Sequence, residues 1–270
     1  MNEYLTGRIR ELSVRARDEA YLTHTDFLSQ SELAEVFDDL RKDGELQVYT
    51  PPESLLINGT ACVVYGGHQD ADRNMLVFLP DYLTKEAWLQ EEAAAGDLIQ
   101  CLHVAPKNKK FADALTHRDY LGALMHLGIV REKTGDILCE DAEAYIFVSA
   151  EIVSVIAEEL TRVKHTDVIC EAVSPENCNF EQKYKELSGS VASERLDAVL
   201  AMAFRLSRGT AKELIDGENV MIDGRTTTDP GRILKAQERI SVRGYGKFIY
   251  DGSGDRTKKG RTFAKVRIFA

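Results

Sequence analysis

The sequence predicts an α+β protein in three parts: an N-terminal helical segment at residues 1–55, a ferredoxin-like α+β domain at residues 56–180, and a small basic α+β domain at residues 188–270. Three observations support this division. The apolar residues follow a helical period up to Gly44 and a strand-like period from about Ser54. Strands and helices then alternate in a known order, and positive charge is concentrated after residue 190.

Two helices are expected in the first forty residues, because two sets of apolar residues are spaced as on one helix face. These positions are Ile9, Leu12 and Ala16, followed by Phe27, Leu33, Val36, Phe37 and Leu40. Thr25 or Ser29 can cap the second helix, and Gly44 ends the region.

The middle of the chain alternates strands and helices. Two short apolar runs at residues 61–65 and 75–79 are expected as strands. The elements expected next are strand 98–104, helix 117–127, strands 136–139 and 144–148, helix 151–160 and strand 168–173. This β-α-β-β-α-β order is that of the ferredoxin-like fold, which RNA-recognition (RRM) domains share, so the domain is predicted to be RRM-like. The polar residues 174–190 are expected to be a connector in which one short strand could lie.

Tyr145 and Phe147 alternate on one face of the third of these strands, where RRM aromatics stack on bases. The strand lacks the basic-glycine start of that motif, and we therefore expect both rings in the core.

The C-terminal part begins with two expected helices. Ser193 can cap a first helix, and Ser207 can cap a second at residues 208–216. Gly217 is expected to adopt the left-handed conformation that ends this helix. Asp223-Gly224 predicts a tight hairpin, because both turn positions need a positive φ.

The charge is distributed unevenly. Residues 191–270 hold 16 Lys and Arg against 10 Asp and Glu, a net of +6, and the other 190 residues carry −16, which together give the −10 of the chain. An acidic body with a basic end is typical of a nucleic-acid-binding protein. No apolar run reaches the ~20 residues of a membrane span, and the charged start lacks the apolar centre of a secretory signal. We expect a cytoplasmic, monomeric protein.

The five cysteines are scattered and form no C-x-x-C pair, which argues against a disulfide framework and a zinc site. His117 and His126 lack a third ligand at metal spacing. No cofactor or metal is expected.

The candidate RNA-binding residues lie outside the predicted core of the basic part. Arg208 and Lys212 share one helical face, while Ala211, Leu214 and Ile215 face inward, so Arg208 is expected to point outward and hold a phosphate. The full candidate set is Arg195, Arg205, Ser207, Arg208, Lys212, Arg225, Arg243, Lys247, Lys258 and Lys259.

Residues 194–225 resemble the S4 RNA-binding domain almost position by position. The R-L-D opening of that family corresponds to Arg195, Leu196 and Asp197. Its S-R-x-x-A-x-x-L-I-x-x-G-x-V centre corresponds to Ser207, Arg208, Ala211, Leu214, Ile215, Gly217 and Val220, and its ending to Val242, Gly244, Gly246, Lys247 and Phe248. Asp223 stands where the family often has Asn, which brings a negative charge closer to the RNA face. The resemblance implies RNA binding, without indicating a pathway.

Two stretches before this domain resemble the YlmH family of bacterial S4 proteins. One contains V-Y-G-G at residues 64–67, D-A-D-R at 70–73 and L-P-D-Y at 79–82. The other contains H-R-D-Y-L-G-A-L at 117–124, L-G-I at 127–129 and G-D-I at 135–137. His68-Gln69 departs from the aromatic-proline pair usual there. The resemblance implies a non-catalytic factor that binds rRNA and tRNA on large ribosomal subunits blocked by peptidyl-tRNA, as in ribosome-associated quality control.

Arg73, His117 and Arg118 lie within these two stretches and form a second set of candidate contacts to RNA or the ribosome. His117 and Asp119 are interpreted as a helix cap and a turn contact, and no catalytic residue is assigned. Two alternatives stay open: an RNA-modifying enzyme anchored by its S4 domain, which would need a cleft with a perturbed Asp or Cys in residues 60–175, and a regulatory protein linked to cell division.

Overall fold

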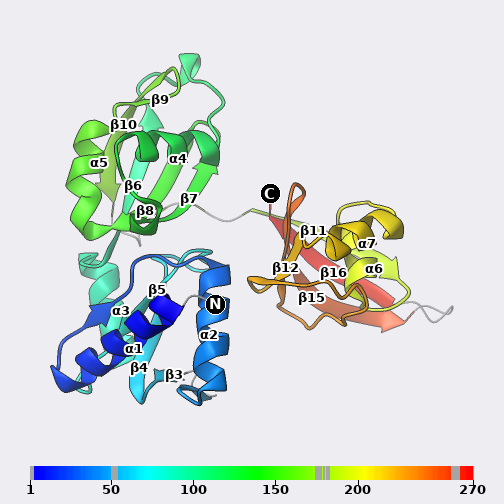
Figure 1. Cartoon of the computed structure of the whole chain (residues 1–270). Helices are drawn as coiled ribbons and strands as arrows, with labels where there is room; N and C mark the ends of the chain where they lie inside the picture. Colours follow the sequence, from blue (N-terminus) through cyan, green and yellow to red (C-terminus); the bar gives the residue numbers. More distant parts are fainter. Residues whose placement is uncertain are drawn as a thin grey trace. The chain divides into compact units, whose positions relative to one another are not determined.

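The computed structural model describes residues 3–49, 54–173, 178, 180, 183–256 and 262–269. The chain forms two compact units, Met1–Phe180 and Glu181–Ala270, each with its own core (Figure 1). None of the helices within these described ranges is long and apolar enough to span a membrane.

The first sheet of unit 1 has the strand order β1-β5-β4-β3-β2. Its strands are β1 (Thr23–His24), β2 (Leu46–Tyr49), β3 (Ser54–Ile57), β4 (Thr60–Tyr65) and β5 (Met75–Phe78). The accompanying helices are α1 (Glu3–Asp18), α2 (Gln30–Lys42) and α3 (Lys85–Ala95). The predicted apolar stripes of α1 and α2 are confirmed for Ile9, Leu12, Val36 and Leu40, which pack in one core with Phe78. Phe27 is the exception, because it precedes α2 and packs in a different core.

The expected separation of a helical segment at residues 1–55 is wrong. Strand β3 crosses that boundary and pairs with β2 on one side and β4 on the other. The two helices therefore belong to a small α+β layer with the strands at 61–65 and 75–79, since they cover that sheet. Ser29 is the cap of α2, where its side chain and that of Glu32 form a capping box.

The second sheet confirms the ferredoxin-like order. Its strands run β7-β8-β6-β10-β9, so the first and third strands of the split motif lie side by side in the centre. The strands are β6 (Ile99–Pro106), β7 (Thr134–Glu140), β8 (Glu143–Ser149), β9 (Arg162–Val163) and β10 (Thr166–Val173). Helices α4 (His117–His126) and α5 (Val153–Glu159) cover one face, with short 3₁₀ turns at Lys109–Phe111, Arg131–Lys133 and Ala150–Ile152.

The other face of this second sheet packs against the first sheet. Phe147 is fully buried there, in one core with Phe27 and Met75. A side chain at Gly135 would come within 2.7 Å of the Phe27 ring, so the two layers can approach this closely only over a glycine. The expectation of a core position holds for Phe147, whereas Tyr145 is half-buried and stacks on His103 at 4.8 Å.

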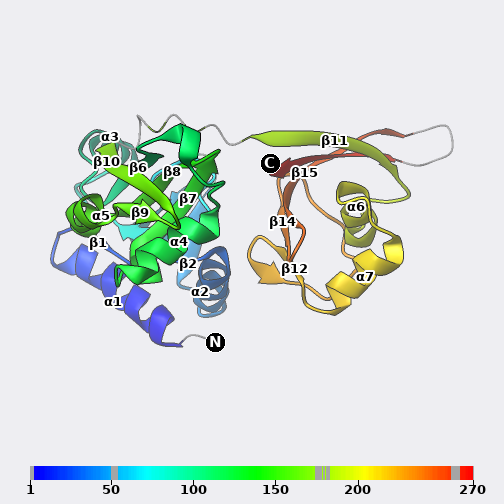
Figure 2. The ribbon, with the colours of Figure 1, turned by 90° about the horizontal axis from the view of Figure 1, so that it is seen from above.

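Unit 2 is a six-stranded antiparallel sheet with two helices on one side (Figure 2). The strand order is β11-β16-β15-β14-β12-β13. The elements are β11 (Tyr184–Val191), α6 (Leu196–Ala203), α7 (Arg208–Asp216), β12 (Val220–Ile222), β13 (Arg225–Thr226), β14 (Arg239–Val242), β15 (Gly246–Arg256) and β16 (Thr262–Phe269). The predicted hairpin is confirmed, because Asp223 and Gly224 have φ values of 47° and 78°.

Three details of unit 2 differ from the expectations. Arg195, and not Ser193, is the N-cap of α6. Gly217 has a right-handed φ of −84°, and Glu218, at φ 59°, makes the left-handed turn that ends α7. Residues 184–191 form the long strand β11, which pairs along its whole length with β16, so the unit begins before the expected residue 188.

Candidate RNA-binding surface

Two arginines of unit 2 are held by one buried carboxylate. Asp197, in the first turn of α6, has a side chain only 8% exposed. Arg195 donates from Nε to Asp197 Oδ1 at 3.1 Å and from Nη2 to Oδ2 at 3.3 Å. Arg208, at the start of α7, donates from Nη2 to Asp197 Oδ2 at 2.6 Å. We call this group the Asp197 clamp.

The clamp presents positive charge outward. The side chains of Arg195 and Arg208 are 41% and 55% exposed, so solvent reaches the guanidiniums but hardly reaches the carboxylate. Burial by itself would raise the pKa of Asp197, but the hydrogen bonds from both arginines outweigh it and hold this pKa below its ordinary value. Asp197 is therefore ionised at neutral pH, and the clamp carries a net charge of +1.

The turn at residues 229–232 positions the start of α6. The backbone N–H of Leu196 donates to Arg232 O at 2.8 Å, and that of Asp197 donates to Pro230 O at 3.2 Å. These two amides are therefore satisfied within the unit. Anion binding at this end of α6 falls to the arginine side chains.

Arg208 is exposed, as expected, but its side chain is not free to move. Its side chain does point outward, but Asp197 fixes it across two helices, a contact between residues eleven positions apart. Ser207 caps α7 as predicted, accepting a hydrogen bond from Thr210 N at 3.0 Å. Lys212 is exposed one turn after Arg208, and Arg205 is exposed with a left-handed φ of 54°.

The remaining basic candidates of unit 2 are spread over the sheet. Arg225 begins β13, opposite Ile222 at one end of β12. Arg243 follows β14 at the other end, where its N–H donates to Asn219 O at 2.9 Å. Lys247 lies in β15 opposite Ser241. The structure thus brings Arg195 and Arg208 together and sets Arg225 and Arg243 at opposite ends of one strand pair. Lys258 and Lys259 lie outside the described residues.

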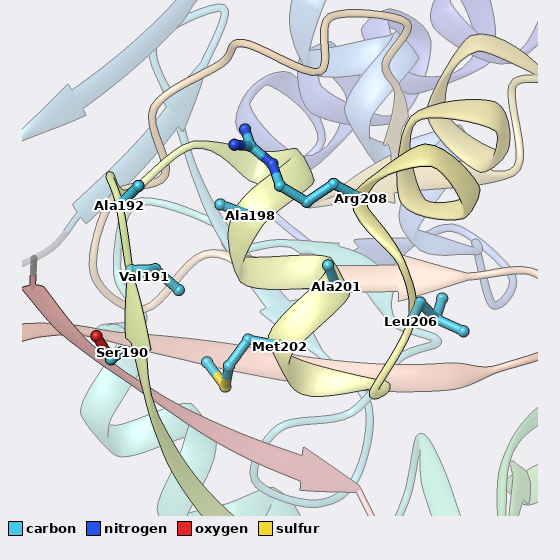
Figure 3. A pocket seen from close by; sticks show the side chains of 8 residues that line it. All are labelled: Ser190, Val191, Ala192, Ala198, Ala201, Met202, Leu206 and Arg208. Carbon is cyan, nitrogen blue, oxygen red and sulfur yellow. The ribbon is translucent and has the colours of Figure 1, made fainter.

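A groove runs beside the clamp (Figure 3). It has a volume of about 490 Å³ and is lined by Ser190, Val191, Ala192, Ala198, Ala201, Met202, Leu206 and Arg208. Figure 3 shows the end of β11 on one side and the α6 side chains on the other, with the Arg208 guanidinium over Ala198. Polar and apolar surface contribute about equally to the lining of this groove. The guanidinium fixed beside it can hold an anionic group. Pattern reasoning missed both the groove and the role of Asp197, although Asp197 belongs to the R-L-D motif.

In unit 1, the candidate Arg73 makes contacts that the sequence did not predict. Its guanidinium donates to three backbone carbonyl oxygens: Thr134 at 3.0 Å, Phe27 at 2.9 Å and Arg131 at 3.3 Å. Burial lowers its pKa, as expected for a side chain withdrawn from solvent. Arg73 therefore ties the two sheets of unit 1 together, and these internal contacts argue against the expected role in RNA binding.

His117 and Arg118 are exposed at the start of α4 and remain candidates. The interpretation of Asp119 as a cap is confirmed, because its carboxylate accepts hydrogen bonds from the N–H and hydroxyl of Thr116 at 2.8 and 2.7 Å. An ion pair with Lys164 at 3.0 Å completes its environment. No group of three or more potential metal ligands occurs among the residues the structure describes.

Comparison with known proteins agrees with both folds. The S4 domain model matches residues 194–240, from the clamp to the start of β14. The model described as "Putative RNA-binding domain in YlmH" matches residues 98–177, the ferredoxin-like part. Together they define an RNA-binding protein with a C-terminal S4 domain.

A particular family follows from a curated relative. The chain is 30% identical over 198 residues, 72% of each chain, to the ribosome-associated protein quality control protein P2 of Bacillus subtilis (strain 168). The chain belongs to the YlmH family. It also resembles the solved structure of the cell division protein YlmH from Streptococcus pneumoniae, with 19% identity, a TM-score of 0.43, and coverage of 64% of this chain and 92% of the other.

Proposed function

We propose that this protein is a non-catalytic factor that binds rRNA and tRNA on the large ribosomal subunit and acts on stalled or obstructed subunits. The observation that carries the proposal is the Asp197 clamp, which fixes Arg195 and Arg208 at the surface of an S4 domain. Two guanidiniums held in place can grip phosphates with less entropy loss than free side chains. The ribosomal site is supported by the name of the Bacillus subtilis relative, a ribosome-associated protein quality control protein.

The charge distribution supports one mode of approach. Unit 2 is positive, whereas the rest of the chain is strongly negative and is repelled by phosphates. Phosphates therefore attract unit 2 and repel the acidic unit, which favours unit 2 as the part that binds RNA. Lys212 is exposed one turn after Arg208 on α7 and extends the same positive face, and Arg205 is exposed just before this helix.

Four of the perturbed groups of unit 1 support a non-catalytic role. Burial raises the pKa of Cys62, Cys139 and Cys170, which disfavours the reactive thiolate. Burial also raises the pKa of Glu92, but its carboxylate accepts hydrogen bonds from the N–H groups of Leu98 and Ile99 and so has a structural task. Cys178 differs, because a hydrogen bond with the Cys101 thiol lowers its pKa.

Cryo-electron microscopy of particles that co-purify with the full-length chain tests the proposal. We expect large subunits carrying tRNA, with unit 2 against rRNA and the Asp197 clamp at a phosphate. Particles that contain only small subunits, or density in which the clamp faces solvent, would contradict it.

A further inference from the structure

On the sheet face of unit 2 opposite the helices, strand β16 carries aromatic and basic side chains in alternation. Ala264 and Val266 point into the core, whereas Phe263, Lys265 and Arg267 alternate with them on the opposite face. Phe269 continues this outer row, and Tyr184 of β11 lies beside it in register. We call Phe263, Lys265, Arg267, Phe269 and Tyr184 the aromatic–basic strip. Figure 2 shows α6 and α7 together on one side of the long strands that carry it.

One end of the strip is closed by its own contacts. The Tyr184 and Phe269 rings meet edge to face at 5.1 Å, and the Arg267 guanidinium lies 5.2 Å from the centre of the Tyr184 ring. Arg239 lies 5.4 Å from the centre of the Phe269 ring. Arg267 Nε also donates to the two carboxylate oxygens of Asp251 at 2.9 and 3.0 Å, so the ring and this carboxylate hold the Arg267 guanidinium in place and its charge is paired.

The other end of the strip is open. Phe263 is 43% exposed. Its neighbours across the strands are small, because Ser190 pairs with Phe263 on β11, while Ser188 and Gly252 flank Lys265. With no bulky side chain at these positions, a planar group can approach the Phe263 ring while Lys265, about 7 Å further along the strand, meets its charge.

We propose that the aromatic–basic strip is a second RNA site, which binds single-stranded RNA by stacking a base on Phe263 and holding the backbone with Lys265. Exposed aromatic rings interleaved with cations are the features by which sheets bind single strands. The strip goes beyond the proposed function, because it lies on strands outside the S4 match at residues 194–240 and uses none of the clamp residues.

The positive charge of unit 2 favours nucleic acid over an apolar protein partner, since a protein interface of this kind would leave Lys265 to be desolvated without a counter-charge. The two sites then bind different kinds of RNA. The clamp meets the phosphates of structured RNA, and the strip receives an unpaired segment.

The test uses the full-length chain and a fluorescent single-stranded uridine oligomer of about ten nucleotides, within the usual range of such sites. Phe263→Leu keeps apolar bulk and removes the stacking ring, and we expect its affinity to fall roughly 5- to 150-fold. Phe111→Leu, a change at a 76% exposed phenylalanine of unit 1, is the matched control and should bind normally. Phe263→Trp should retain affinity, and its added indole fluorescence should be quenched by stacking, against a constant background from the buried Trp88.

Equal binding by wild type and Phe263→Leu, or unquenched Phe263→Trp at saturation, would overturn the proposal. Loss of oligomer binding in Arg208→Ala but not in Phe263→Leu would assign the oligomer to the clamp, overturning the strip and sparing the proposed function. Conversely, the oligomer could bind through Phe263 while the protein fails to bind large-subunit rRNA. That result would support the strip and refute the proposed function. A dimer abolished by Phe263→Leu with unchanged RNA binding would assign the face to a second copy and overturn the proposal.

Discussion

Replacement of Asp197 by asparagine separates charge from positioning in RNA binding. Asp197→Asn keeps the size of the side chain but removes a negative charge from the RNA-binding unit. If affinity followed net charge alone, the variant would bind RNA more tightly, because the repulsion of phosphates decreases. If the clamp positions Arg195 and Arg208, the variant will bind more weakly despite its added positive charge.

The magnitude follows from the contacts. Each guanidinium released from Asp197 must be ordered again on binding, at about 0.5–1.5 kcal/mol per side chain, which gives about 1–3 kcal/mol for the two arginines. Affinity should therefore fall roughly 5- to 150-fold. The loss of stability should be smaller than for a fully buried pair, because both arginines are about half exposed and regain water. We expect about 1–2 kcal/mol.

The assay is an anisotropy titration with a structured fragment of large-subunit rRNA, alongside thermal unfolding of the full-length chain. Asp216→Asn is the control, because it removes the same charge from an exposed position at the end of α7. The control should bind as well as wild type or slightly better. If Asp197→Asn binds as tightly as the control while remaining folded, the positioning role of Asp197 is refuted.

Further predictions concern single residues and solution conditions. Arg208→Ala should weaken binding to structured RNA by about 1–3 kcal/mol, and Arg208→Lys should restore only part of the loss because lysine lacks the planar fork; equal titration curves for all three proteins would contradict this. Arg73→Met should destabilise unit 1 by about 2–3 kcal/mol in urea unfolding, because three carbonyl oxygens lose a charged donor. The same variant should bind RNA with unchanged affinity, and weaker binding by a folded variant would show that Arg73 contributes to RNA binding. The logarithm of affinity should fall with the logarithm of salt concentration with a slope of about −2 to −4, and a flat profile would exclude phosphate contacts as the main interaction. Because the pKa of Asp197 is lower in the folded protein than its unfolded value of about 3.9, its ion pairs stabilise the protein above about pH 4 and are lost as pH falls through the folded pKa. Acid titration of stability should therefore show a loss in wild type that Asp197→Asn lacks.

Local patterns predicted the elements whose signals lie within a few residues. Helix α7 begins and ends where its cap and apolar face indicated, and the Asp223-Gly224 turn forms the expected hairpin. The order of the ferredoxin-like strands followed from hydrophobic periodicity, because each element has a clear apolar face.

Contacts between distant residues decided the features that sequence reasoning missed. Strand β11 contains Ser188, Gly189 and Ser190, a composition typical of a linker, so at most a short strand was expected there. Pairing with β16, 71 to 85 residues later in the chain, makes it an edge strand of 8 residues. Nothing local shows that Arg73 turns inward to carbonyls of the neighbouring sheet. The same holds for the Asp197 clamp, because Arg208 reaches Asp197 only when α7 packs on α6.

Co-sedimentation with purified large ribosomal subunits tests the central claim most directly. The variant is Arg195→Ala/Arg208→Ala, and the control is Arg41→Ala/Arg162→Ala, which removes two charges from exposed arginines of unit 1. We predict that wild type and control sediment with the subunits at low salt and are released at high salt, while the clamp variant stays in the supernatant under both conditions. Sedimentation of a folded clamp variant with the subunits to the same extent as wild type would contradict the account.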